Sequence, residues 1–391
     1  MKIISLSSYP VSTPQHGGQR RAEAIMQCAA AQGVQITNLP IFFAASYPGA
    51  TAFEMQTALS ETDRSALAQA GLREDLHICQ ALDPDHPAVA AALGRIRALA
   101  PDALQFEQPW LYPLFAPLLA DGGEFAHMAV IYSSQNIESD LLPAAFHAEA
   151  TALEQRLARR ADLAVAVCAA DAAVLADWRD AAQHPVVLAP NGSWPPPALP
   201  SDSPRPIPQD YVLFVGSAHP PNAEGYWQTL GVVPGCIPPT GRFLIAGGVN
   251  NLLGADARFQ KFRRLNAALV HNLGMVSEDQ LTALLHHALA ITLPITGGGG
   301  TNLKTAEALL SLKPVVAMRA AFRGFEHLAD LPGVYLAEDA PGFRRLIRDA
   351  FTGGLHSTRQ ASDVASLEWT SALAPLQRAY QGLLQNRRVA T

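Results

Sequence analysis

The feature that most constrains this chain is a repeated alternation of short apolar runs with longer Ala- and Leu-rich stretches. Short apolar runs bounded by turn residues are typical of strands buried on both faces of a sheet. Strands that alternate with helices form parallel sheets covered by helices, so the pattern predicts an α/β fold. The expected strands are 2–8, 34–41, 76–82, 102–107, 129–134, 163–168 and 185–190, then 211–218, 242–248, 269–276, 288–295, 314–318 and 333–337.

A proline-rich stretch, residues 191–210, divides this alternation into two halves. Its seven prolines in twenty positions are incompatible with a helix or a central strand. With 391 residues the chain is long enough for two domains. The sequence therefore predicts a doubly wound, Rossmann-like domain over residues 1–190, a linker over 191–210 and a second such domain over 211–365. Ligands bind beyond the carboxyl ends of parallel strands, so we expect the two domains to face a central cleft.

Composition limits the possible functions. A net charge of −6 gives no general attraction to nucleic acid or to anionic lipid. The four cysteines are far apart and form no CxxC pair, which argues against a disulfide framework or a zinc cluster. The first residues resemble no signal peptide, and no apolar run is long enough to span a membrane. We expect a cytoplasmic protein, and attachment to the inner face of a membrane stays open.

The stretch "PITGGGGTNLKTAEALL", residues 294–310, places four glycines and a lysine between an expected strand and an expected helix. A triphosphate-binding loop of the form GxxxxGK[ST] would fit Gly298, Lys304 and Thr305. Leu303 occupies the position that this motif reserves for glycine, and no strand ending in aspartate follows. A Walker loop is therefore disfavoured.

A helix that begins near Asn302 accounts for the same residues better. At about 100° per residue, Leu303, Ala306, Leu309 and Leu310 share one face that suits the core. Lys304 and Glu307 project toward the open side. A lysine near a helix N-terminus is electrostatically unfavourable unless an anion binds there, and free backbone N–H groups would help to hold a diphosphate. The simpler alternative is a glycine-rich turn followed by a solvent-exposed Lys/Glu pair.

Several motifs in order resemble glycosyltransferases of family 4, which have the GT-B fold. The residues 298–318, "GGGTNLKTAEALLSLKPVVAM", are similar to the C-terminal signature of that family. Further matching motifs are "HGGQRRAE" (16–23), "YSSQNIES" (132–139), "LAPNGS" (188–193), "LFVGSAHPPNAEGYW" (213–227), "FLIAGG" (243–248) and "LGMVSEDQL" (273–281). The resemblance implies that a C-terminal helix, residues 366–391, crosses back onto the first domain. Trp369, Leu373, Leu376 and Tyr380 have the helical spacing for that packing.

The resemblance also implies roles for individual residues. Lys304 would neutralise the donor diphosphate and act in catalysis, while Glu307 would bind the ribose. The remaining donor-binding residues implied are Gly299, Gly300, Thr301 and Asn302 for phosphate, Gly274, Met275 and Val276 for the base, and Gly216. The residues implied for the transferred sugar and the acceptor are His16, Gly17, Gly18, Gln135, Asn136 and Glu138.

Two positions depart from the family pattern. Many relatives carry a sugar-contacting glutamate where this chain has Gly299, and others read His-Asn-x-Glu where it has Gln135-Asn136-Ile137-Glu138. Among the carboxylates of the first half, Glu107 and Glu138 follow expected strands, so either is a candidate to bind an acceptor hydroxyl or to act as a base.

The function predicted is transfer of a sugar from a nucleotide diphosphate donor to a hydroxyl of a glycan, a lipid-linked glycan or a protein. GT-B relatives generally need no metal, and single histidines such as His219 and His271 lack metal-ligand spacing, so we expect neither a metal nor another cofactor. Three alternatives stay open: a GT-B epimerase or phosphorylase, a non-catalytic subunit that binds nucleotide sugars, and a nicotinamide dehydrogenase. The dehydrogenase would need GxGxxG after the first strand, which the chain lacks.

Overall fold

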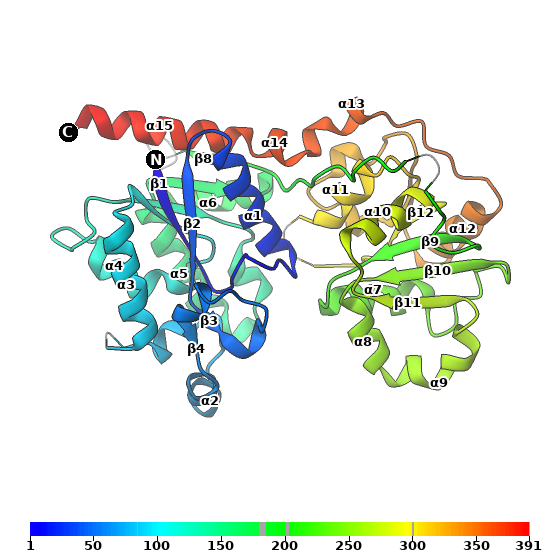
Figure 1. Ribbon diagram of the computed structural model, residues 1–391, viewed down its shortest axis with the longest axis horizontal. Coiled ribbons are helices and arrows are strands. Elements are labelled where there is room, and N and C mark those ends of the chain that lie inside the picture. Colours follow the sequence, from blue (N-terminus) through cyan, green and yellow to red (C-terminus); the bar gives the residue numbers. More distant parts are fainter. Residues whose placement is uncertain (84, 180–184, 201–202, 299–300, 391) are drawn as a thin grey trace. The chain divides into compact units, whose positions relative to one another are not determined.

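The computed structural model describes residues 1–83, 85–179, 185–200, 203–298 and 301–390, with side chains through Leu383. The chain divides into two compact units. Unit 1 consists of Met1–Pro190 and Ala372–Thr391, and unit 2 of Asn191–Ser371. Figure 1 shows strands and helices alternating along the chain in both units.

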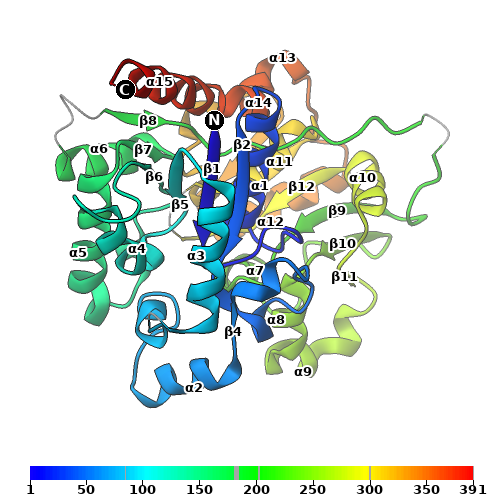
Figure 2. The ribbon, with the colours of Figure 1, turned by 60° about the vertical axis from the view of Figure 1, so that its left-hand side comes forward.

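Unit 1 is built on a parallel six-stranded sheet within the described residues, in the order β2-β1-β5-β6-β7-β8. Alternate residues of β1, β5 and β6 form one apolar face that packs against α3, α4 and α5, as Figure 2 shows. The other face carries Ser5 and Gln105 and lies toward α1 and α15. The strands are β1 (Lys2–Ser7), β2 (Gln35–Pro40), β5 (Ala103–Phe106), β6 (Ala129–Ser133), β7 (Leu163–Ala166) and β8 (Val186–Leu188), with β3 (Phe42–Phe43) and β4 (Ala58–Leu59) pairing separately.

The strand expected at residues 76–82 is wrong, because this stretch holds the 3₁₀ helix η3 (Ile78–Ala81). His77 satisfies the local backbone, since its Nδ1 accepts from the N–H of Arg73 at 2.8 Å. The helices of unit 1 are α1 (Gly17–Ala30), α2 (Glu61–Gln69), α3 (Pro87–Leu99), α4 (Tyr112–Leu119), α5 (Ala144–Arg160), α6 (Ala169–Trp178) and α15 (Ala374–Ala390), with 3₁₀ turns η1 (Ala44–Ser46), η2 (Glu54–Thr57), η4 (Pro109–Leu111) and η5 (Glu138–Leu141).

Unit 2 has a second parallel sheet, in the order β11-β10-β9-β12-β13-β14. This is the Rossmann strand order, and the order reverses between β9 and β12. All six strands expected in this half are present: β9 (Asp210–Val215), β10 (Gly241–Ala246), β11 (Val270–Gly274), β12 (Ala290–Leu293), β13 (Val315–Met318) and β14 (Val334–Ala337).

Helices cover both faces of this second sheet. One apolar face packs against α10, α11 and α13, and the other against α7, α8, α9 and α12. The bounds are α7 (Pro220–Leu230), α8 (Val249–Ala255), α9 (Ala257–Asn266), α10 (Glu278–His287), α11 (Leu303–Leu310), α12 (Ala340–Phe351), α13 (Ala361–Val364) and α14 (Trp369–Ala372), with η6 (Arg319–Phe322), η7 (Glu326–Leu328) and η8 (Ala365–Leu367).

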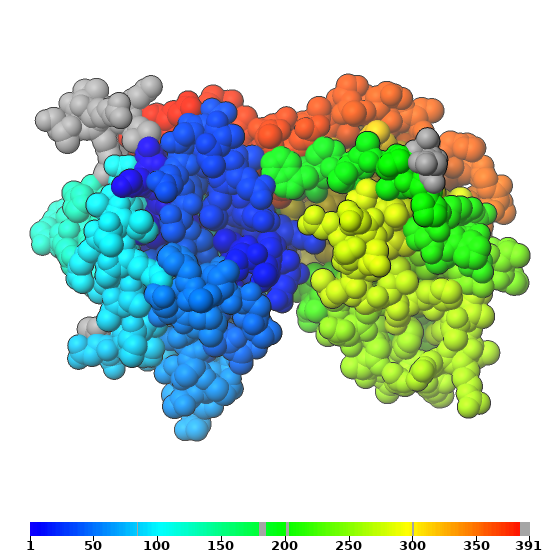
Figure 3. Space-filling model, in the orientation of Figure 1, coloured from blue at the N-terminus to red at the C-terminus, as the bar shows by residue number. Residues whose placement is uncertain are grey.

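Two segments carry the chain between the units. Residues 191–200 lie along the surface of unit 2, as the bright-green atoms of Figure 3 show. Ser193 pairs there with the returning segment: its N–H donates to Leu367 O at 2.8 Å, and its carbonyl accepts from Trp369 at 3.1 Å. On the unit 1 side, the Tyr380 hydroxyl of α15 donates to Gln105 Oε1 at 2.6 Å. Trp369, Leu373, Leu376 and Tyr380 are all buried.

Candidate donor and acceptor sites

The reversal of strand order in unit 2 brings the loop after β9 and the loop after β12 to neighbouring positions at the carboxyl edge of the sheet. Such a switch point is where open α/β sheets bind ligands, because the two following helices diverge and leave their N-termini exposed. The glycine-rich stretch of the sequence lies after β12, so the motif occupies the position that the topology favours.

Helix α11 begins at Leu303 with Asn302 as its N-cap residue, as predicted. Thr305, Ala306, Ala308, Leu309 and Leu310 are its buried residues, and Leu303 is only half-buried, so the expectation that Leu303 belongs to the core is wrong. Lys304 and Glu307 are half-buried in the first turns. Gly299 and Gly300 lie outside the described residues.

Thr301 and Asn302 are held by contacts within the fold. The Thr301 hydroxyl accepts from Asn191 Nδ2 at 2.6 Å. Asn302 is buried, and its amide nitrogen lies 3.3 Å from Thr305 Oγ1 and from Ala321 O. The Asn302 amide thus shapes the start of α11. A direct phosphate contact from this side chain stays a prediction.

Two further basic residues, His219 and Arg323, lie at this edge of the sheet. Partial burial and the Lys304 ammonium lower the pKa of His219, which caps α7 after β9. Arg323, which follows β13, lies against Gly298 of the glycine-rich loop. Sequence reasoning noted His219 as a single histidine and missed Arg323, although both follow strands whose carboxyl ends share this edge.

The other predicted donor residues lie at the neighbouring strand ends. The backbone N–H of Gly216 donates to Ala246 O at 2.9 Å, and a Cβ at Gly216 would come within 2.9 Å of Val249. Packing against α8 thus explains this glycine. The Gly274 carbonyl accepts from Gly247 at 2.7 Å, which fixes the turn after β11. The next side chain, Met275, is 75% exposed, while Val276 is half-buried.

In unit 1, Glu107 directly follows β5 next to the end of β1. Its side chain is 1% exposed, and Oε1 accepts from Ser5 Oγ at 2.8 Å and from Gln105 Nε2 at 2.6 Å. Oε2 accepts from Gln135 Nε2 at 3.3 Å. The carboxylate therefore organises a buried polar network in this arrangement, and its role as a catalytic group stays a prediction.

The predicted acceptor residues around α1 come together through the same network. Gln135 Nε2 donates to the Tyr9 hydroxyl at 2.6 Å, and a Cβ at Gly18 would lie only 2.4 Å from Gln135 Oε1. His16 caps α1 and meets the ring of Tyr9 edge-on, with ring centroids 4.8 Å apart. Gly17 is the first residue of the helix. The structure thus groups His16, Gly17, Gly18 and Gln135 at one end of β1.

Glu138 lies three residues after Gln135, at the start of η5, and is half-buried. Burial is the main cause that raises the pKa of Glu138 to about 8, and the Glu154 carboxylate adds to it. A hydrogen bond from Asn136 acts in the opposite direction. Glu154 itself is fully buried and accepts from Tyr132 Oη at 2.7 Å and from the N–H of Glu138 at 3.0 Å.

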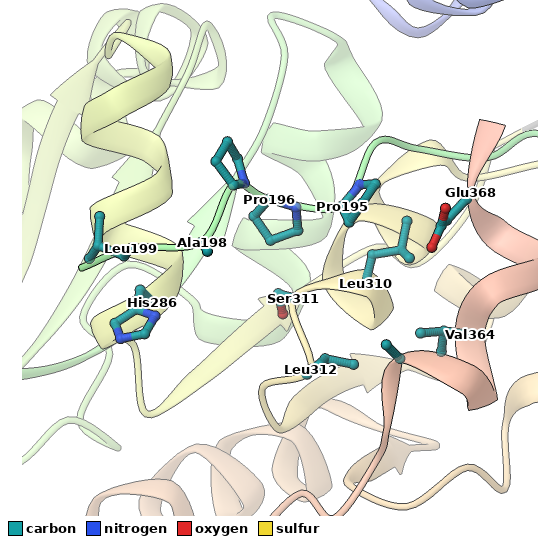
Figure 4. A pocket seen from close by; sticks show the side chains of 12 residues that line it. Pro195, Pro196, Ala198, Leu199, His286, Leu310, Ser311, Leu312, Val364 and Glu368 are labelled. Atoms are coloured by element: carbon teal, nitrogen blue, oxygen red, sulfur yellow. The ribbon is translucent and has the colours of Figure 1, made fainter. Parts of the chain in front are cut away.

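A pocket of about 320 Å³ lies at the other end of α11. Figure 4 shows proline rings of the linker and the side chains of Leu310 and Leu312 around it, with His286 and Glu368 as ionisable neighbours. None of the predicted site residues lines this pocket. The pocket lies at the C-terminal end of α11, whereas Lys304 lies in the first turn of this helix.

The described residues contain neither a cluster of metal ligands nor a helix suited to span a membrane. No group of three or more His, Cys, Asp or Glu side chains in this part of the chain is arranged to hold a metal ion. No helix among the same residues is long and apolar enough to cross a membrane.

Comparison with known proteins agrees with the motif reading. Residues 209–352, which lie within unit 2, match the family described as glycosyl transferases group 1. A search of curated proteins found no significant match. The resemblance to group 1 glycosyltransferases inferred from the motifs is thereby confirmed for this part of the chain.

Solved structures resemble the whole chain. HepE from Anabaena, solved with UDP and glucose, has a TM-score of 0.65 at 17% identity over 98% of this chain and 100% of its own. Sucrose-phosphate synthase from Thermosynechococcus elongatus gives 0.69 at 15% identity over 99% and 100%. A glycosyltransferase from Rickettsia africae gives 0.63 at 12% identity over 98% and 99%. The fold is therefore that of GT-B glycosyltransferases, with two Rossmann-like units, and glycosyl transfer is the activity that the family match supports in general.

Proposed function

We propose that this protein transfers a sugar from a nucleotide diphosphate donor to a hydroxyl group of an acceptor. The observation that carries the proposal is the position of Lys304 and Glu307 on the first turns of α11, at the switch point of unit 2 and inside the segment that matches the glycosyltransferase family. Unit 2 would hold the donor, and unit 1 would hold the acceptor near the N-terminus of α1.

Lys304 is proposed to act on the leaving group. When the bond to the anomeric carbon breaks, negative charge grows on the diphosphate. A lysine beside it therefore interacts more strongly with the transition state than with the ground state. The partial positive charge at the N-terminus of α11 would add to this effect. Glu307, one turn farther, can accept hydrogen bonds from two neighbouring hydroxyls such as those of a ribose.

We also propose that the reaction needs no metal ion, because protein cations would neutralise the diphosphate. Treatment of the purified enzyme with a chelator should then leave turnover unchanged. A loss of activity that added Mg²⁺ or Mn²⁺ restores would contradict this part of the proposal.

A second candidate function is nucleotide-sugar binding without catalysis. The observation that favours it is the state of Glu107, whose two carboxylate oxygens are both engaged inside unit 1. Such a protein would keep the donor site and lack a base in unit 1. It would bind a donor and release no nucleoside diphosphate in the presence of any acceptor.

The test is donor turnover by the purified protein with a panel of nucleotide sugars. HepE has been solved with UDP-glucose, so uridine donors come first, followed by guanosine donors. We expect Lys304→Ala to lower kcat by about a hundredfold, the size of effect found when one transition-state donor is removed. Lys261→Ala, an exposed lysine on α9, is the matched control and should behave as wild type. Equal turnover by wild type and Lys304→Ala would refute the assignment.

A further inference from the structure

Arg323 lies directly against the glycine-rich loop of unit 2. The position that a Cβ at Gly298 would take is 3.3 Å from Nη2 of Arg323, 3.8 Å from Nη1 and 4.0 Å from Cζ. Nη2 and Nη1 lie closer to this position than Cζ does, so the guanidinium directs the edge that carries its two terminal nitrogens toward Gly298. A side chain at residue 298 would therefore compete with the guanidinium for the same space.

The backbone that carries Arg323 is tied to the start of α11. The carbonyl of Ala321, two residues before, accepts from Asn302 Nδ2 at 3.3 Å and from the Thr305 hydroxyl. Gly324, one residue after, packs on Thr301, since a Cβ at Gly324 would lie 2.2 Å from Thr301 Cγ2. The segment 321–324 thus contacts Gly298 and the start of α11, from Thr301 to Thr305.

Two buried phenylalanines hold the same segment against the core of unit 2. Phe322 and Phe325 are each 1% exposed and belong to the core that also contains Leu309 of α11. Between them Arg323 is half-buried, so its side chain leaves a fixed backbone and reaches the loop. The long side chain is therefore positioned by its surroundings and is not a freely rotating surface group.

Three positive groups belong to these adjoining segments. The N-terminus of α11 carries about half a positive charge, Lys304 adds one in its first turn, and Arg323 adds another across the loop. Like charges held close together favour an anionic ligand, and a guanidinium can bind two oxygens of a phosphate or a carboxylate with parallel hydrogen bonds.

We propose that Arg323 is a donor-binding residue that holds an anionic group beyond the nucleoside monophosphate. This inference rests on the proposed function. The anionic group is either the terminal phosphate of the diphosphate or a carboxylate on the donor sugar, because both present two oxygens to a guanidinium. Arg323 would thereby make the protein select diphosphate donors, or acidic-sugar donors, over other nucleotides.

The experiment measures equilibrium binding of four ligands to the full-length protein: a nucleoside monophosphate, the diphosphate, the diphosphate-glucose and the diphosphate-glucuronate, with the base that wild type binds best. The variants are Arg323→Gln, Arg323→Lys and, as a matched control, Arg319→Gln. Arg319 lies in the same turn and forms an exposed ion pair with Glu338, with N and O 2.5 Å apart. Melting temperatures without ligand verify that each variant is folded.

We expect Arg323→Gln to lower the affinity for the ligand that Arg323 contacts by about ten- to a hundredfold. The affinity for the monophosphate should stay within about twofold of wild type. A loss for the diphosphate identifies the terminal phosphate as the partner. A loss confined to the glucuronate donor identifies the sugar carboxylate. In either case Arg323→Lys recovers part of the affinity, because it retains the charge, and Arg319→Gln matches wild type.

The inference is overturned if Arg323→Gln binds all four ligands as wild type does, or if it weakens the monophosphate and the diphosphate equally. If wild type binds the donors and Arg323→Gln binds them equally tightly, only the role of Arg323 is refuted, and the proposed function stands. Wild type that binds no nucleotide at all refutes the proposed function, and the role of Arg323 with it.

Discussion

Single side chains in unit 1 show how burial determines protonation. Glu138 and Glu154 are neighbouring carboxyl groups, and burial raises the pKa of both, that of Glu138 to about 8. Near neutral pH the native protein therefore holds a proton on Glu138 that the unfolded chain releases. Because the native state binds more protons, the free energy of unfolding falls as the pH rises between the unfolded pKa and the native one.

This gives a prediction for pH dependence. The contribution of the Glu138 carboxyl to the stability of unit 1 should be greatest below about pH 4.5 and should decline as the pH rises to about 8. Glu138→Gln, which mimics the protonated form, should flatten that decline. Urea denaturation at several pH values between 5 and 8 measures the free energy of unfolding. Asp140→Asn, a substitution at a nearby exposed residue, is the control. An unchanged pH slope in Glu138→Gln would contradict the account.

At the residue scale, the helical spacing of α11 predicted the positions of Lys304 and Glu307, but not that of Leu303, which is half-buried like them. The spacing of Lys304 and Glu307 on α11 placed both outside the buried face, as observed. It could not foresee the environment of Glu107, because a position after a strand fixes the backbone and not the partners of the side chain. Arg323 was missed for a related reason: its contact with Gly298 joins two loops that are distant in the sequence.

At the scale of elements, the first turn of α1 depends on the absence of a side chain at Gly18. Gln135 occupies that space and is held there by the Tyr9 hydroxyl and by Glu107. Gly18→Ala should therefore displace Gln135 and cost about 1–3 kcal/mol of stability, since an inserted methyl group strains a packed site and breaks hydrogen bonds.

A double-mutant cycle measures this coupling by chemical denaturation. In a Gln135→Ala background the space is open, so adding Gly18→Ala should cost clearly less than it does in wild type. If the cost of Gly18→Ala is the same in both backgrounds, Gln135 is not the residue that requires a glycine.

Elements with strong patterns were predictable, and short apolar runs were not. Ser277 and Gln280 gave a capping-box signal, and α10 begins there with Ser277 Oγ accepting from the N–H of Gln280 at 3.2 Å. The run at residues 76–82 reads like a strand because Leu76, Ile78 and Leu82 are all apolar. These residues are indeed buried, but they lie in a turn, in the 3₁₀ helix η3 and just after it, where the backbone hydrogen bonds are local. Burial alone does not distinguish the two structures.

At the scale of the whole molecule, the alternation of strands and helices determines two Rossmann-like units, and the proline-rich stretch marks the first passage between them. The sequence could not fix where the chain returns. The expected helix over residues 366–391 is divided into the end of η8, α14 and α15. Unit 1 resumes at Ala372, because tertiary packing of α15 against β7 and β8 decides that boundary.

The central claim is that unit 2 binds a nucleotide diphosphate sugar at the start of α11. Calorimetric titration of the purified protein with such donors tests it most directly. We expect saturable binding that Lys304→Ala and Glu307→Gln each weaken by about tenfold or more, with Lys261→Ala binding as tightly as wild type. Absence of binding by wild type across uridine and guanosine donors, or undiminished binding by both variants, would contradict it.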